Sequence, residues 1–335
     1  MSIGTGAAIF GCAGTELQPD EAAFFRDFDP AGFILFARNV ESPSQIKRLT
    51  ADLRACVGRD APIFIDQEGG RVQRLRAPHW REWMPPLDFV AAAGARAVEA
   101  MRLRAALIGA EHRALGIDGN CAPTLDVIGA DTHPFLKNRC YGSDPEVVSR
   151  IGRAVADGLL QAGVLPVMKH LPGHGRSMVD THHDLPRVTA RREVLQAIDF
   201  APFRALADLP LAMTAHLVFT AYDADHPATQ SPALIRAIRE EIGFAGLLMT
   251  DDLNMQALRG SLAERTRAAM AAGCDLALHC KGALDEMIQV AGQAGRLAPA
   301  ALARMQAALA LRQPMELDFA AMDAELRSIM DRAHG

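Results

Sequence analysis

Short apolar segments alternate with amphipathic segments along this chain of 335 residues. Eight of the apolar segments have the length of β-strands, and their hydrophobic residues run continuously, which is typical of parallel strands covered on both faces. These candidate strands are residues 6–11, 32–36, 62–66, 119–123, 165–169, 210–216, 246–250 and 274–279.

Helix-start signals precede several of the amphipathic segments between the strands. Ser42, Asp144 and Ser231 are each followed by proline, as expected of an N-cap residue before the first helical turn. Eight alternating strands and helices predict an α/β fold, specifically a (β/α)8 TIM-type barrel. The alternative, a doubly wound sheet, is disfavoured because no GxGxxG fingerprint follows the first strand.

The sequence shows no internal repeat and no linker rich in proline and serine. We therefore expect one domain over residues 1–335, with the barrel over about residues 1–295 and added C-terminal helices over about residues 296–335. Half of the residues are hydrophobic and 22% are charged, which is enough apolar material for a large core.

The charge pattern favours a small-molecule partner. Acidic and basic residues are interspersed with a formal net charge of -5, so we expect neither a nucleic-acid partner nor a membrane partner. The six cysteines form no CxxC pair, which argues against a zinc knuckle and favours a reducing compartment. A signal peptide begins with basic residues, and no basic residue precedes Arg26, so a cytoplasmic location is expected. We also expect the protein to be a monomer.

Polar residues follow seven of the eight candidate strands. In a barrel of this class the carboxyl ends of the strands gather at one face, where active sites are found. Any one of these residues alone could be a structural cap, but seven sets on one face indicate a site. They are Arg38, Asn39, Asp66, Gln67, Glu68, Asp126, Lys169, His170, His216, Asp251, Asp252 and His279.

The segment 171–190, LPGHGRSMVDTHHDLPRVTA, interrupts the alternation of strands and helices. It holds three histidines and two aspartates, and a long connection of this kind inside a domain is usually functional. Within it Asp180 precedes His182 by two residues, so the carboxylate could orient the imidazole for proton transfer near neutral pH. An Asx-turn with a solvated histidine is the structural alternative.

Two reactions would use this set of residues. In glycoside hydrolysis, Asp251 would attack the anomeric carbon from a rigid strand end while His182 protonates the leaving oxygen. In metal-assisted hydrolysis, histidines and a carboxylate would hold a cation, but the spacing of His170 and His174 across a Pro-Gly turn disfavours it. We therefore expect no metal and no cofactor.

Structural alternatives remain for several of these residues. Lys169 could form only a structural ion pair, and one carboxylate of the Asp251-Asp252 pair could cap a turn. Trp80 and Trp83 could line a sugar platform or pack in the core. A non-catalytic sugar-binding barrel would need none of the catalytic roles.

Four motifs in this order resemble those of the family 3 glycoside hydrolases. They are IDQEGGRVQRL from Ile65, KHLPGHG from Lys169, DTH from Asp180 and TDDLNM from Thr250. Within that family the sequence is similar to the bacterial cytoplasmic β-N-acetylglucosaminidases of peptidoglycan recycling. The resemblance extends from about Gly32 to Cys274, which is most of the chain.

The resemblance implies a barrel enzyme with a retaining, two-step mechanism that releases N-acetylglucosamine (GlcNAc) from the non-reducing end of 1,6-anhydro-muropeptides. Asp251 would be the nucleophile, His182 the acid and base, and Asp180 its orienting partner. Phosphorolysis remains an alternative outcome. The residues implied in sugar binding are Asp66, Arg74, Arg139, Lys169 and His170.

Overall fold

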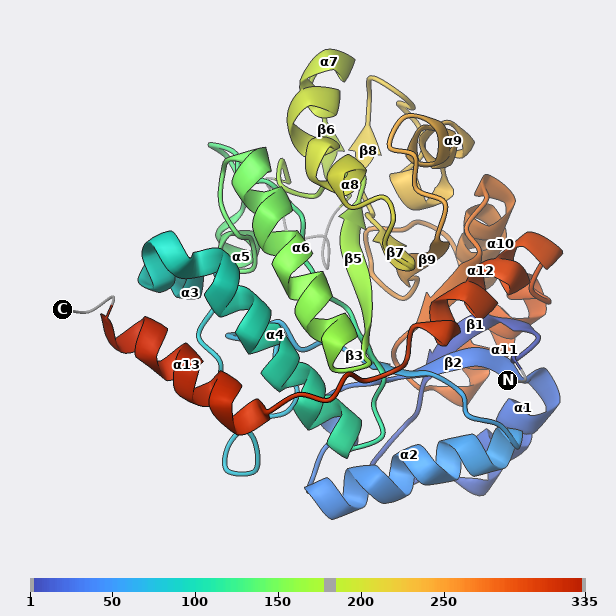
Figure 1. Ribbon diagram of the computed structural model, residues 1–335. Coiled ribbons are helices and arrows are strands. Elements are labelled where there is room, and N and C mark those ends of the chain that lie inside the picture. The colour runs from blue at the N-terminus through green and yellow to red at the C-terminus, as the bar shows by residue number, and fades with distance from the viewer. Residues whose placement is uncertain (1–2, 178–184, 333–335) are drawn as a thin grey trace.

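A closed barrel of eight parallel strands forms the centre of the protein in a computed structural model, which describes residues 3–177 and 185–332 (Figure 1). All eight predicted strands are present, and the barrel confirms the predicted TIM-type fold. Its strands in spatial order are β1 (Gly6–Gly11), β2 (Pro30–Leu35), β3 (Ile63–Ile65), β4 (Gly119–Asn120), β5 (Leu165–Leu171), β7 (Leu211–Thr214), β9 (Leu247–Asp252) and β10 (Leu276–His279), which pairs with β1.

Helices surround the barrel, and the predicted N-caps begin three of them. The side chains of Ser42, Asp144 and Ser231 accept hydrogen bonds from backbone amides in the first turns of α2, α6 and α9. The helices are α1 (Pro19–Phe28), α2 (Pro43–Val57), α3 (Pro86–Ala93), α4 (Ala97–Ala114), α5 (Pro134–Lys137), α6 (Pro145–Gln161), α7 (Arg192–Val194), α8 (Ala201–Ala205), α9 (Pro232–Glu240), α10 (Leu262–Ala272), α11 (Leu284–Ala294), α12 (Pro299–Ala310) and α13 (Phe319–Arg332).

The strand boundaries differ from the sequence prediction where the ladder is irregular. β5 continues to Leu171, so Lys169 and His170 lie inside the strand rather than after it. β4 is only two residues long, although Cys121 N still donates to Ile65 O at 2.9 Å. A small second sheet, which the sequence pattern did not indicate, pairs β6 (Arg187–Val188) with β8 (Val218–Phe219).

Alternation along the strands sends every second side chain into the barrel. On β9, Leu247 and Met249 belong to the inner apolar cluster, whereas Leu248 packs in the outer cluster beneath the helices. The same register continued to the strand end points Asp251 inward. Phe64 of β3 and Leu165 and Val167 of β5 belong to the same inner cluster.

Helix α12 closes the barrel at the amino-terminal ends of the strands. Arg296, just before it, pairs with Gly6 at the start of β1. From α12, the inner cluster of the barrel receives Ala301, Met305, Ala308 and Leu309. A site can therefore form only at the opposite end of the barrel, at the carboxyl ends of the strands.

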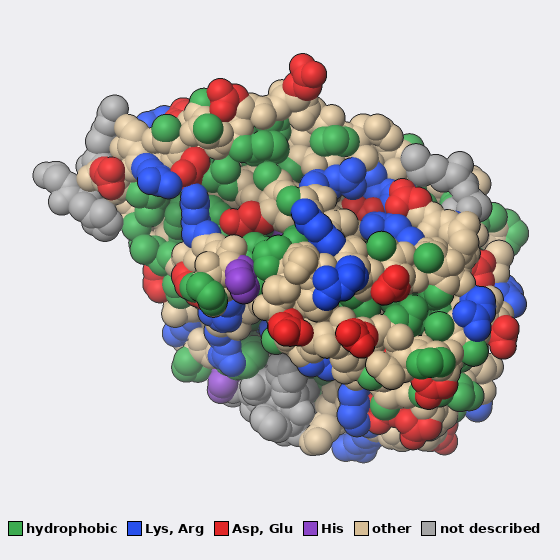
Figure 2. Space-filling model, turned by 90° about the horizontal axis from the view of Figure 1, so that it is seen from below, with side chains coloured by type: hydrophobic (Ala, Val, Ile, Leu, Met, Phe, Trp, Pro, Cys, Tyr) green, Lys and Arg blue, Asp and Glu red, His purple; other side chains and the backbone are tan. Residues whose placement is uncertain are grey.

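The last helix lies on the outside of the barrel layer. α13 packs against α4, and Arg81 Nη2 is 2.6 Å from Asp323 Oδ1 of α13 (Figure 1). On the face shown in Figure 2, acidic and basic side chains are interspersed. No helix in residues 3–177 and 185–332 is long and apolar enough to cross a membrane.

Shortening Met305 to alanine should lower the free energy of unfolding by about 2–5 kcal/mol, because it leaves a cavity in the inner core. Met305 is 1% exposed, whereas Met315 beyond the same helix is 59% exposed and provides the control. Met315→Ala should change the stability by no more than about 0.5 kcal/mol. Equal losses for both variants in denaturant unfolding would contradict the role given to α12.

Candidate active site

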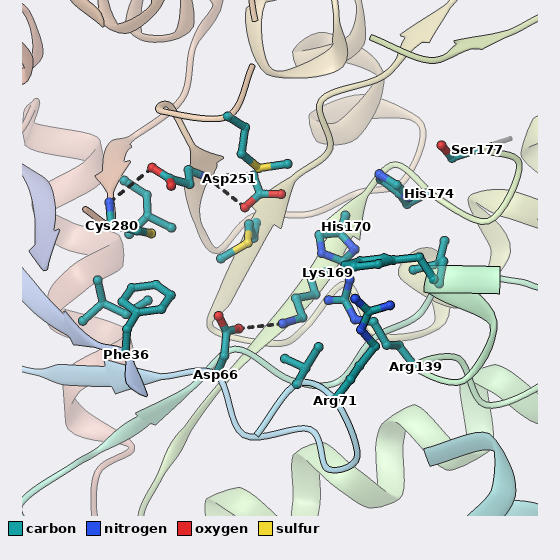
Figure 3. A pocket seen from close by; sticks show the side chains of 18 of the residues that line it. Phe36, Asp66, Arg71, Arg139, Lys169, His170, His174, Ser177, Asp251 and Cys280 are labelled. Carbon is teal, nitrogen blue, oxygen red and sulfur yellow. Dashed lines mark hydrogen bonds and ion pairs between the residues drawn. The ribbon is translucent and has the colours of Figure 1, made fainter. Parts of the chain in front are cut away.

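A pocket of about 560 Å³ opens at the carboxyl ends of the barrel strands (Figure 3). This volume lies within the usual range of small-molecule sites, about 300–1,000 Å³. One part of its lining is apolar, from Ile34, Phe36, Val72, Met213, Met255 and Leu278. The other part is polar, from Asp66, Arg71, Arg74, Arg139, Lys169, His170, His174, Asp251 and Asp252.

A network of ion pairs occupies the floor of this pocket. Lys169 Nζ lies 2.8 Å from Asp66 Oδ1 and 2.6 Å from Glu68 Oε1. Arg139 binds Glu68 with two nitrogens, at 2.8 and 2.9 Å, and Arg74 Nη2 lies 3.1 Å from Asp66 Oδ2. The two carboxylates are therefore held by three cations, and none of these five side chains is independent of the others.

The network fixes the charge of its members. Burial alone would raise the pKa of Glu68, but Arg139 and Lys169 hold it at about 2. Burial alone would likewise lower the pKa of Lys169, but Asp66 and Glu68 raise it above its ordinary value. Glu68 and Lys169 are consequently ionised at neutral pH.

The local backbone explains why Asp66 and Glu68 meet the same lysine. Alternation along β3 brings Phe64, Asp66 and then Glu68 to one side of the chain. In the loop that follows β3, the carbonyl oxygen of Glu68 accepts a hydrogen bond from Arg104 Nη2 at 2.7 Å. Gly69 has a φ of +106°, and a Cβ there would lie 2.0 Å from Arg104 Nη2, so glycine is required for this contact.

His170 is held by a second buried carboxylate. Its Nδ1 donates to Asp126 Oδ2 at 2.7 Å, and Nε2 has no hydrogen bond within residues 3–177 and 185–332. Asp126 Oδ1 also accepts from the backbone amide of His174 at 2.7 Å. Burial and the neighbouring His170 lower the pKa of His174 to about 3, so its ring is neutral.

Two adjacent carboxylates at the end of β9 have different environments. Burial would raise the pKa of Asp251, but the His216 and His170 rings and the Asp252 amide hold it below its ordinary value. Burial raises the pKa of Asp252 to about 6 despite hydrogen bonds from the amides of Asn254 and Cys280. Asp251 is therefore the more acidic of the two, and Asp252 caps the following turn.

His216 supports this strand end from behind. Its Nε2 donates to Asp252 O at 3.0 Å, and its Nδ1 lies 2.7 Å from Thr229 Oγ1. The ring does not line the pocket. It holds the backbone that carries Asp251.

Asp180, His182 and His183 lie outside the described residues. The segment that leads to them is anchored up to Ser177, because His133 N donates to Ser177 O at 2.9 Å and Arg176 Nε lies 2.7 Å from Asp199 Oδ2. A Cβ at Gly175 would lie 1.8 Å from Val127 O, so this glycine is required by close packing.

The six sequence-predicted site residues that the structure describes all line the pocket. They are Asp66, Arg74, Arg139, Lys169, His170 and Asp251. Their individual roles remain predictions. Of the other strand-end residues, Arg38 and His279 do not line the pocket. The two tryptophans also lie away from the pocket: Trp83 is buried in the core, and Trp80 packs against the core.

Sequence reasoning gave no role to Glu68, Asp126 or Arg71. The alternation from Asp66 to Glu68 was a signal that could have assigned Glu68. Asp126 is 44 residues from its partner His170, and no local pattern joins them. Among residues 3–177 and 185–332, no group of three or more His, Cys, Asp or Glu side chains is arranged to hold a metal ion.

The comparisons with known proteins show the family of this chain. The model of the glycosyl hydrolase family 3 N-terminal domain matches residues 13–310. The chain belongs to glycoside hydrolase family 3. The β-hexosaminidase of Methylococcus capsulatus is 34% identical over 331 residues, which are 97% of this chain and 98% of that relative. The β-hexosaminidase of Xylella fastidiosa is 38% identical over 85% of this chain and 87% of its own length.

Solved structures of family 3 enzymes have the same fold. NagZ from Neisseria gonorrhoeae in complex with N-trifluoroacetyl-D-glucosamine is 28% identical with a TM-score of 0.84, covering 99% of this chain and 98% of that one. A β-N-acetylglucosaminidase from Paenibacillus sp. is 30% identical with a TM-score of 0.86, and this chain spans 66% of it. The present chain is a glycoside hydrolase, a β-N-acetylhexosaminidase.

Replacing Glu68 with glutamine should lower the free energy of unfolding by about 3–5 kcal/mol at pH 7, because Lys169 and Arg139 lose a buried counter-ion. The folded-state pKa of Glu68 is depressed from 4.5 to about 2, so its stabilisation is present above pH 4.5 and is lost as the pH falls towards 2. Denaturant unfolding should show that the difference in free energy of unfolding between wild type and Glu68→Gln, the stability gap, disappears as the pH falls over this range. Glu16→Gln, at an exposed position, should show no gap. A gap independent of pH would contradict the network.

Proposed function

We propose that this enzyme is a retaining exo-β-N-acetylglucosaminidase that releases GlcNAc from the non-reducing end of 1,6-anhydro-muropeptides in cytoplasmic cell-wall recycling. The observation that carries the proposal is Asp251, an ionised carboxylate that projects from a rigid strand end into a pocket lined by fixed polar groups. The names of the relatives support the sugar, since several are β-hexosaminidases and one solved relative holds an N-acylated glucosamine.

In the first step, Asp251 forms a bond to the anomeric carbon while the bond from that carbon to the leaving oxygen breaks. His182 donates its proton to the departing oxygen, and Asp180 orients the ring. In the second step, His182 takes a proton from water as the water oxygen displaces Asp251. The proton count is restored, and the anomeric configuration is retained after two inversions.

The floor of the pocket would bind the hydroxyls and N-acetyl group of the sugar. Lys169 uses two of its three donors on Asp66 and Glu68, which leaves one for a sugar oxygen. Asp66 keeps acceptor sites beyond its bonds to Lys169 and Arg74. Arg139 and the free Nε2 of His170 would complete this recognition.

The state of the cysteines supports the cytoplasmic assignment. All six thiols are free, and five of them are buried. A reducing compartment keeps thiols in this form.

Replacing Asp251 with asparagine should reduce kcat on an aryl β-N-acetylglucosaminide by roughly a thousandfold or more, because no covalent intermediate can form. In the wild type, rapid-quench mass spectrometry should find the glycosyl adduct on the peptide that contains Asp251, and NMR should show the β-anomer as the first product. Asp225→Asn, at an exposed position, serves as the control with unchanged activity. Initial release of the α-anomer would refute the retaining mechanism.

Replacing His182 with alanine should lower kcat/KM by about 10²- to 10⁴-fold on substrates with poor leaving groups, which require protonation. The 2,4-dinitrophenyl glycoside needs little protonation and should lose far less in its glycosylation step. The neighbouring His183→Ala variant is the matched control, since Asp180 is two residues from His182 and three from His183. If the loss of activity does not depend on the leaving group, a residue other than His182 is the acid.

A further inference from the structure

Arg71 differs from the other cations that line the pocket. Lys169, Arg74 and Arg139 each have a carboxylate of Asp66 or Glu68 within ion-pair distance. In the part of the chain that the structure describes, Arg71 has no ion pair and no hydrogen bond to its side chain. It is exposed, whereas Lys169 on the floor is 2% exposed. Arg71 is thus a positive charge at the rim of a site whose other cations are neutralised.

The guanidinium of Arg71 is nevertheless held in place. Its central carbon lies 3.4 Å from the centroid of the Phe135 ring, at the stacking distance of two planar groups. Phe135 belongs to the short helix α5, which His133 caps by accepting from the Phe135 amide at 3.2 Å. Stacking fixes the plane of a guanidinium while its N–H edges stay available, and those edges fit a carboxylate with two parallel hydrogen bonds.

The loop that carries Arg71 is also fixed. The amides of Glu68 and Gly69 both donate to Val72 O, at 2.8 and 3.0 Å, which makes a tight turn with Arg71 near its tip. Arg71 and Arg139 lie on the same side of the pocket, across from Phe36 (Figure 3). A ligand group at this rim would meet an oriented cation without reorganisation of the backbone.

We propose that Arg71, stacked on Phe135, binds a carboxylate on the part of the substrate that leaves, and so selects acidic aglycones. This inference rests on the proposed function: an exo-acting site holds the terminal sugar on its floor, so the leaving part lies towards the rim. Lys169 and Arg139 do not serve this role, because Asp66 and Glu68 neutralise their charges and the proposed function assigns their remaining donors to the terminal sugar. Arg71 is then a specificity residue and takes no part in bond cleavage.

The test compares two disaccharides that differ in one group. Both carry GlcNAc linked β-1,4 to 1,6-anhydro-N-acetylmuramic acid without a peptide, one with its free lactyl carboxylate and the other with the corresponding carboxamide. The wild-type enzyme should have the higher kcat/KM on the acid. Arg71→Gln should reduce this acid-to-amide ratio by roughly 5- to 20-fold, as expected for an oriented but partly solvated ion pair.

Three matched variants isolate the cause. Lys137→Gln removes a positive charge from the same helix as Phe135 without altering the pocket lining, and should leave the ratio unchanged. Arg71→Lys keeps the charge but not the planar fork, and Phe135→Leu removes the stacking surface; both should give intermediate ratios. Wild type should also lose part of its preference as salt is raised from 50 mM to about 1 M, because exposed charges are screened.

The outcomes separate this inference from the proposed function. If neither disaccharide is cleaved, the proposed function fails. If both are cleaved and Arg71→Gln keeps the wild-type ratio, only the role of Arg71 is overturned. Arg71 could instead receive inorganic phosphate as the attacking group; in that case added phosphate would yield GlcNAc 1-phosphate in an Arg71-dependent manner, and the aglycone assignment would be wrong.

Discussion

The buried ammonium of Lys169 is the group on which the architecture of the pocket depends. It projects inward from β5 and bridges Asp66 and Glu68, which follow β3, across the two-residue strand β4. Without it, the buried carboxylate of Glu68 and the partly buried carboxylate of Asp66 would face each other with only Arg74 and Arg139 as counter-ions. A buried charge is costly unless it is paired, so each member requires the others. The same contacts that hold two strand ends together therefore create the polar floor of the site.

This mutual neutralisation leaves a simple charge pattern for function. In the described part of the chain, Asp251 and Arg71 are pocket residues of opposite charge that have no ion-pair partner. Asp251 is held ionised by the His216 and His170 rings and the Asp252 amide, without a direct counter-ion that would quench its nucleophilicity. Arg71 lies exposed at the rim. The charges on the floor pair with one another, whereas Asp251 and Arg71 have no direct counter-ion in the described residues.

The amino-terminal end of the barrel contributes to stability, and the carboxyl-terminal end carries the site. At the amino-terminal end, α12 seals the inner core with Met305 and small or aliphatic neighbours. At the carboxyl end, the inward register continues past the apolar positions into Asp66, Lys169 and Asp251. One alternating pattern along each strand thus supplies both the core and the site.

The sequence by itself determined the eight strands, three helix starts and the polar residues that end the strands, because these depend on local hydrophobic order and capping. Alternation within a strand also fixes which side chains point inward. Only the tertiary structure decided which of them meet: Glu68 as the counter-ion of Lys169 and Arg139, Asp126 as the partner of His170, and Phe135 beneath Arg71. These contacts join segments dozens of residues apart, and their distances are set by closure of the barrel, which no local pattern encodes.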